Sequence, residues 1–164
     1  MADSEDLLPP PGLAAIDALF VQTAHSAGYC AGQLTLYGLS RSTLYFADRP
    51  QRAVGHLHTQ LFVALWESGM HSFADDPPNA VLSFIESGAT GENAGIPEDA
   101  VVVLHAPKLS GDELTYYVDL LDGKLPERSG GCALFIDSFG RPVSPALLAA
   151  MQKLSRFRQA TRDW

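Results

Sequence analysis

The sequence has few cysteines, few basic residues and no long apolar run. Only two of its 164 residues are cysteines, Cys30 and Cys132, which excludes a disulfide-rich secreted scaffold and predicts buried free thiols, with one disulfide as the alternative. Lys and Arg number 11 against 19 Asp and Glu, and the net charge is -8. Such a surface disfavours nucleic acid as a partner. No apolar run reaches the ~20 residues of a membrane span, so we expect no membrane partner either.

Recognisable catalytic and cofactor motifs are also missing. The chain has no Gly-x-Ser-x-Gly nucleophile elbow, no phosphate loop and no dinucleotide fingerprint, so the enzyme classes that these motifs mark are excluded. We therefore expect no cofactor. The first residues are acidic and proline-rich, where a secretory signal would be basic and then apolar, which predicts a cytoplasmic protein.

The domain organisation is simple. Residues 1–12 lack hydrophobic periodicity and end in Pro9-Pro10-Pro11-Gly12, a pattern that predicts a disordered tail. Residues 13–164 are enough for one hydrophobic core, and they predict a single β-rich domain.

Short extended segments separated by turn formers predict a mainly β fold of the α+β class. Their spacing is typical of an antiparallel β-barrel or sandwich of about six or seven strands. The expected strands begin near Ala18 and cover residues 33–37, 43–46, 80–86, 100–105, 114–120 and 132–136.

Two helices are expected in addition to the strands. Residues 59–68 carry an apolar stripe after Thr59 as an N-cap, which predicts an inserted helix. Residues 146–157 follow Ser144-Pro145 and place Leu147, Met151 and Leu154 on one helical face, which predicts a C-terminal helix. We expect its apolar face to cover part of the sheet, with recruitment of a partner as the alternative.

Histidines and carboxylates are the candidates for acid–base chemistry. His56 can transfer protons near neutral pH, and Asp48 or Asp76 could orient it. The alternative is structural, with Asp48 in a local ion pair and Asp76 in a turn before two prolines. His56, His58 and His71 would suit zinc or copper, but no ligand follows at zinc-motif spacing, so we expect no metal.

Aromatic strand residues are the candidates for ligand binding. Tyr45 and Tyr116 each have an aromatic neighbour in the sequence, and because strand residues alternate in direction, one of each pair faces the interior. In a hollow barrel these rings, with Arg49, would line a pocket for an apolar or mixed-polarity small molecule. In a filled interior they would be core.

Four motifs stand out between about residues 18 and 145: Thr43-Leu44-Tyr45-Phe46-Ala47-Asp48-Arg49-Pro50, Gly55-His56, Asp76-Pro77-Pro78-Asn79-Ala80 and Leu134-Phe135-Ile136-Asp137. Together they resemble a family of small bacterial and fungal β-rich proteins of unknown function. The resemblance implies no chemistry, but it selects His56, Asp48, Arg49 and Asp76 as the polar positions to test first. His58 and His71 fall outside the pattern.

Three functions follow as hypotheses. The first is a small-molecule-binding protein. The second is a cofactor-free isomerase or cyclase that uses His56 with an aspartate. The third is a structural module that forms a homo-oligomer through its C-terminal helix.

Overall fold

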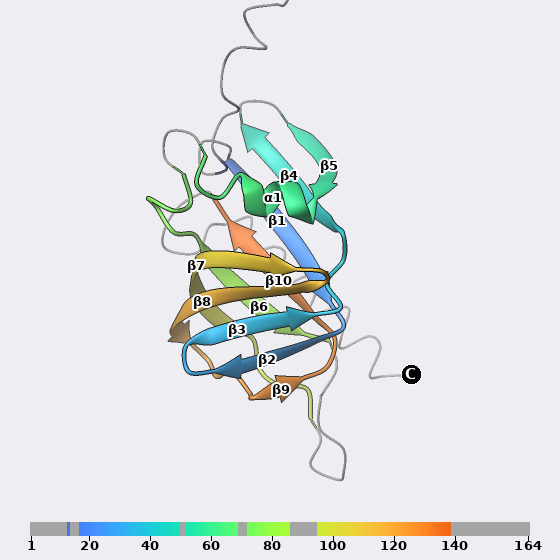
Figure 1. Ribbon diagram of the computed structural model, residues 1–164, viewed down its shortest axis with the longest axis vertical. Helices are drawn as coiled ribbons and strands as arrows, with labels where there is room; N and C mark the ends of the chain where they lie inside the picture. The colour runs from blue at the N-terminus through green and yellow to red at the C-terminus, as the bar shows by residue number, and fades with distance from the viewer. Residues whose placement is uncertain (1–12, 14–16, 50–51, 69–71, 86–94, 139–164) are drawn as a thin grey trace, which may run out of the picture.

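The structure is a computed structural model that describes residues 13, 17–49, 52–68, 72–85 and 95–138. Within these residues the chain forms ten strands and one α-helix, α1 (Thr59–Ala64) (Figure 1). The strands are β1 (Asp17–Ala24), β2 (Ser26–Cys30), β3 (Gln33–Tyr37), β4 (Ser42–Arg49), β5 (Ala53–His58), β6 (Asn79–Phe84), β7 (Ala100–Ser110), β8 (Glu113–Asp122), β9 (Arg128–Ser129) and β10 (Cys132–Asp137). The predicted tail 1–12 and the predicted helix 146–157 lie outside the described residues.

The described strands belong to one sheet. Their order is β5-β4-β1-β10-β6-β7-β8-β3-β2-β9, and every neighbouring pair is antiparallel. The expected mainly antiparallel β architecture is confirmed. The expectation of a closed barrel is wrong, because β5 and β9 stand at the two ends of the strand order. The expected strand number of six or seven is also wrong, since the described part of the chain holds ten.

The strands missing from the prediction are β2, β5 and β9. They lie at or next to the two ends of the sheet. In β2 only Ala27 is buried, and in β5 no residue is. Strands that bury few side chains do not show the regular alternation of apolar and polar residues by which strands are recognised in a sequence.

A bend at His25 divides one long extended segment into β1 and β2. Before the bend, β1 pairs with β4 and β10, and after it β2 pairs with β3 and β9. The bend thus lets consecutive strands join different parts of the sheet, as at the corner of an orthogonal packing. In Figure 1, β7, β8, β3 and β2 lie in front of β1, β10 and β6 and run across them.

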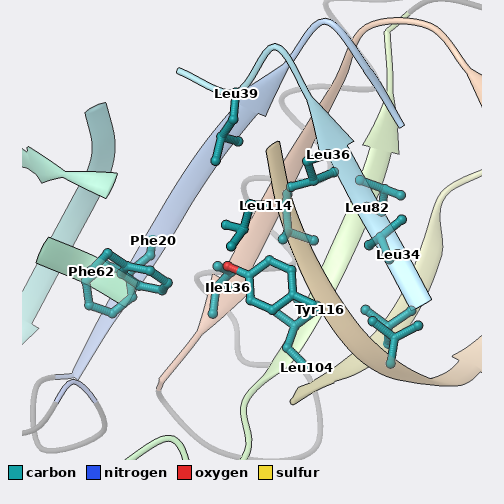
Figure 2. Close-up of a cluster of buried hydrophobic side chains, with 14 of the residues drawn as sticks. Phe20, Leu34, Leu36, Leu39, Phe62, Leu82, Leu104, Leu114, Tyr116 and Ile136 are labelled. Carbon is teal, nitrogen blue, oxygen red and sulfur yellow. The ribbon is translucent and has the colours of Figure 1, made fainter. Parts of the chain in front are cut away.

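The two arms of this bent sheet enclose the main core. Figure 2 shows side chains from β1, β3, β6, β7, β8 and β10 meeting between the arms, among them Phe20, Leu104 and Ile136. Leu82, Leu104 and Tyr116 have no accessible surface. Large side chains therefore fill the interior, in keeping with the close packing of protein cores.

Helix α1 closes one side of this core with aromatic contacts. Phe62 lies edge-on to Phe20 at 5.3 Å and to Trp66, just beyond the helix, at 5.9 Å. The predicted inserted helix is confirmed at its start but ends earlier than residue 68. Thr59 is not its N-cap: that position is His58, and the Thr59 hydroxyl donates to the carbonyl of Ser40 at 2.8 Å.

Candidate functional site

The structure separates the predicted partners His56 and Asp48. His56 is exposed on β5, where it pairs with Leu44 of β4, and its Nδ1 lies 3.4 Å from the Ser42 Oγ. Asp48 lies four positions beyond Leu44 on the same strand, which is ~13 Å at the usual strand rise. It faces Arg52, whose Nε is 3.5 Å from its Oδ1, in an exposed pair. Arg49 ends β4 and pairs in register with Asp17 of β1.

Asp76 lies in a turn between α1 and β6. The Asp76 amide donates to the carbonyl of Ser72 at 2.9 Å, and the Asp75 amide donates to the Ser72 Oγ at 3.2 Å. Asp76 itself is exposed. The proposed catalytic roles of Asp76, Asp48 and His56 stay predictions.

The two predicted ligand-binding tyrosines occupy different environments. Tyr45 is half-buried and lies against Gly55 of the neighbouring strand, where an added Cβ would be 2.7 Å from the Tyr45 hydroxyl oxygen. Tyr116 is fully buried, and its hydroxyl donates to Gln22 Oε1 at 2.8 Å. Burial raises the pKa of Tyr116 above its ordinary value, and the hydrogen bond to Gln22 opposes this shift only in part.

A cleft opens at the bend between β1 and β2. Its volume is about 1370 Å³. Four segments form its walls: the end of β1 with His25, the β3–β4 connection, helix α1 with the last residue of β5 before it, and the tip of the β7–β8 hairpin. Its apolar surface includes Leu39, Val63 and Leu109.

Backbone hydrogen bonds hold the walls of this cleft together. The amide of Ser40 donates to Thr23 at 2.9 Å, that of Leu39 to Asp112 at 2.9 Å and that of Thr59 to Arg41 at 2.8 Å. These bonds join the β3–β4 connection to each of the other three segments. The cleft is therefore part of the fixed hydrogen-bonded frame of the fold.

Gly38 makes room for His25 at this bend. It has φ of +60°, and a Cβ at this position would lie 2.5 Å from the His25 Cδ2. The imidazole thus rests directly on the glycine backbone. The His25 amide also donates to the Tyr37 carbonyl at 2.9 Å. Only glycine combines this conformation with so close an approach.

Most of the titratable side chains that line the cleft are basic. His25, Arg41 and His58 line it, and Asp112 is the one acidic residue among the described lining residues. Among the residues that the structure describes, none forms a hydrogen bond or ion pair with the side chains of these three basic residues. In a chain of net charge -8, the cleft gathers unused donors that suit an anionic group.

A chain of buried hydrogen bonds connects the core to the cleft. Tyr116 donates to Gln22, and the Gln22 amide donates to the Thr43 hydroxyl at 3.3 Å. Thr43 and Thr59 are 2.9 Å apart. Because the Thr59 hydroxyl donates to the Ser40 carbonyl, Thr43 must be the donor to Thr59. All the donors in this chain therefore point in one direction, from the core toward the cleft wall.

Sequence reasoning did not select His25 or Arg41, and it considered His58 only as a metal ligand. The available signal was their position: each is a polar residue where a strand ends or a turn begins, which is where binding residues tend to occur. The bend at His25 brings the three side chains to one cleft. The sequence around His25 reads as one extended segment, so it does not predict this bend.

Other chemical features of the described chain are few. No group of three or more His, Cys, Asp or Glu residues gathers there as a metal site. No described helix is long and apolar enough to cross a membrane. Cys30 and Cys132 are both free thiols; the expected burial is confirmed for Cys132 and wrong for Cys30, which is exposed at the end of β2.

Comparison with known proteins adds no relative to this description. No family model, no curated protein sequence and no solved structure matches the chain. The resemblance to a family of small β-rich proteins therefore stays a prediction, and the candidate site rests on the geometry of the cleft.

Proposed function

We propose that the chain binds a small organic molecule of mixed polarity, carrying a carboxylate or phosphate group, in the cleft at the bend. The observation that carries this proposal is the set of three basic side chains, His25, Arg41 and His58, that line one cleft without a partner among the described residues. Guanidinium and imidazole donors bind carboxylate and phosphate oxygens well.

The cleft favours a ligand with an apolar portion as well as the acidic group. Leu39, Val63 and Leu109 supply apolar surface beside the basic side chains. Small-molecule sites generally combine such a surface with a few polar groups that set orientation. The sequence analysis placed the ligand in a hollow interior lined by aromatic residues. Large side chains fill the space between the arms, so we place the binding site in the surface cleft instead.

Arg41 is the residue to test. Its guanidinium stays charged at physiological pH and can form a bidentate contact with a carboxylate or phosphate. We expect Arg41→Gln to weaken binding by roughly tenfold to a hundredfold, the usual worth of a charge-assisted hydrogen bond. The measurement is titration calorimetry with carboxylates and phosphate monoesters, selected first by thermal shift against their neutral amide and alcohol counterparts.

Two variants serve as matched controls. Arg52→Gln removes an equal charge outside the cleft, where Arg52 pairs with Asp48, so it should leave the affinity unchanged. His56→Asn tests the alternative of an enzyme centred on His56 and should also bind normally. If Arg41→Gln and Arg52→Gln weakened binding equally, the loss would come from the change in net charge, and the proposed contact with Arg41 would be wrong. A loss of binding in His56→Asn alone would move the site to the outer surface of β5.

A further inference from the structure

A second cleft lies next to the one at the bend. Its volume is about 520 Å³. Its walls are the end of α1 with the residues that follow, a stretch of β7 before the hairpin tip, and the outward-facing side chains of β3 and β8. In Figure 1, α1 lies next to β7, with β8 and β3 beyond it. The second cleft is therefore built in part from the same two elements, α1 and β7, as the first.

The two clefts share part of their walls. Val63 and Ala64 of α1 line both of them. On β7, Lys108 lines the second cleft, and the next residue, Leu109, lines the first. The clefts thus meet at the contact between α1 and β7.

Both elements lead from one cleft to the other. His58, just before α1, lines the first cleft, and Glu67, just after it, lines the second. At β7, Gly111 lines the first cleft and Ala106 lines the second. Ala106 and Gly111 are five positions apart, which is ~16 Å at the usual strand rise. Together the two clefts have the length for an elongated molecule.

A β-bulge in β7 directs two neighbouring side chains to different clefts. His105 pairs with Tyr117 and Lys108 pairs with Thr115, so β7 advances three residues where β8 advances two. In an unbroken strand, Lys108 would lie on the face opposite to His105. The extra residue returns Lys108 to the outer face, where the second cleft lies, and leaves Leu109 to the first.

The bulge has a strained backbone. Ala106 has φ of +46°, a conformation that residues with a Cβ seldom adopt. Pro107 follows it and has no amide hydrogen for the strand ladder. Both residues line the second cleft. Bulges and strained residues occur often at binding sites, because the rest of the fold must hold them in place.

The second cleft offers aromatic rings together with unused polar groups. Trp66 and Tyr117 line it, and Tyr117 is 53% exposed, so its ring is accessible. Lys108 and Glu67 line it as well, and neither forms an ion pair or side-chain hydrogen bond within the part of the chain that the structure describes. A flat ring suits such aromatic walls better than an alkyl chain does, and it can carry polar substituents that meet these groups.

We propose that the ligand is an elongated organic acid that ends in an aromatic ring. Its acidic group lies among His25, Arg41 and His58 in the first cleft, and its ring lies in the second cleft against Tyr117. This inference rests on the proposed function, because the first cleft holds the acidic group. The linker between the two ends crosses the apolar surface of Val63, which both clefts share.

The experiment compares three acids by titration calorimetry on the full chain: phenylacetic acid, octanoic acid and phenyloctanoic acid. All carry a carboxylate, but only phenyloctanoic acid has a ring at the end of a long chain. We expect phenyloctanoic acid to bind roughly threefold to tenfold more tightly than octanoic acid, the usual worth of an aromatic contact. Phenylacetic acid should bind more weakly than either, because it is too short to leave the first cleft.

Two variants locate the ring. Tyr117→Ala should abolish the difference, so that phenyloctanoic acid and octanoic acid bind equally. Phe46→Ala is the matched control and should keep the difference, because Phe46 is 45% exposed and lines neither cleft. Should Tyr117→Ala fail to fold, Tyr117→Leu removes the aromatic ring but keeps an apolar side chain, and the same comparison applies.

Two results would overturn this inference while leaving the proposed function in place. One is phenyloctanoic acid that binds no more tightly than octanoic acid, and the other is an undiminished difference in Tyr117→Ala; in both cases Arg41→Gln would still weaken the binding of all three acids. If Arg41→Gln bound the acids as tightly as the unmodified chain, the proposed function would be wrong, and this inference would be wrong with it.

Discussion

Tyr116 shows how a single polar group can tie the core to the candidate site. Its ring lies among apolar side chains, while its hydroxyl begins the directed hydrogen-bond chain through Gln22, Thr43 and Thr59. A buried network of this kind is stabilising only while every member has a partner. Removing the first donor leaves the Gln22 oxygen buried without its partner.

We expect Tyr116→Phe to lower the free energy of unfolding by about 1–3 kcal/mol, the usual cost of an unsatisfied buried acceptor. Urea unfolding measures this difference. Tyr117→Phe is the matched control, because Tyr117 is 53% exposed and its hydroxyl makes only a 3.4 Å contact with Gln33. Its effect should stay below about 0.5 kcal/mol. Equal losses in the two variants would mean that the network contributes nothing of its own.

At the level of single residues, the sequence predicted burial better than partnership. Phe62 occupies the core, as its place on the apolar stripe indicated, because burial follows periodicity. In the pair Tyr116 and Tyr117 one ring was expected to face the interior, and Tyr116 is that ring. The predicted pairing of His56 with Asp48 is not seen, because contact between two strands depends on the register of β4 and β5. That register pairs His56 with Leu44 instead, and neither strand carries a local signal that sets it.

The turn of the β2–β3 hairpin has a residue, Ala31, that does not favour the backbone conformation of the turn. Its turn residues Ala31 and Gly32 both have positive φ, at 52° and 81°, as a two-residue hairpin turn of type I′ requires. Glycine adopts this conformation freely, and asparagine tolerates it better than alanine does. Ala31 therefore holds the turn under local strain.

We expect Ala31→Asn to raise the free energy of unfolding by about 0.5–1 kcal/mol, because an Asn-Gly pair fits this turn. Chemical denaturation measures the gain. Ala53→Asn is the control: Ala53 is exposed at the start of the extended strand β5, where asparagine brings no such advantage. A gain of the same size at both positions would contradict the role of the positive φ.

At the level of elements, prediction succeeded where a strand buries one face. The strands at residues 33–37 and 132–136 and the helix beginning at Thr59 are present as expected. Prediction failed for β2 and β5, which bury almost nothing. The cleft was not predicted for a related reason: four segments that are far apart in the sequence meet there, and their proximity depends on how the whole sheet is arranged.

The molecule as a whole should lose stability at alkaline pH. Burial raises the pKa of Cys132 from 9.0 to about 12, and it raises the pKa of Tyr116 as well. Above pH 9 the unfolded chain releases the Cys132 proton while the folded chain keeps it. The free energy of unfolding therefore falls as pH rises from 9 toward about 12.

We expect this fall to be on the order of 1 kcal/mol per pH unit for each such group. Urea unfolding between about pH 8 and about pH 11 measures it, and Cys132→Ala should reduce the slope. Cys30→Ala is the control, because Cys30 is exposed, and it should leave the slope unchanged. An identical pH dependence in the Cys132→Ala variant would show that this thiol does not contribute.

The position of β10 has a consequence for how the protein is made. This strand is the last of the described strands in the chain, yet it lies near the middle of the sheet, between β1 and β6. Ribosomes release residues in chain order, so β1 and β6 leave without the strand that joins them. Until residue 137 has emerged, neither β1 nor β6 has its shared neighbour in the sheet. The neighbouring strands β2, β3, β8 and β7 can pair with one another earlier, because all four precede β10 in the chain. Joining β1 to β6 is therefore the step that waits for the end of the described chain, and it makes the sheet continuous.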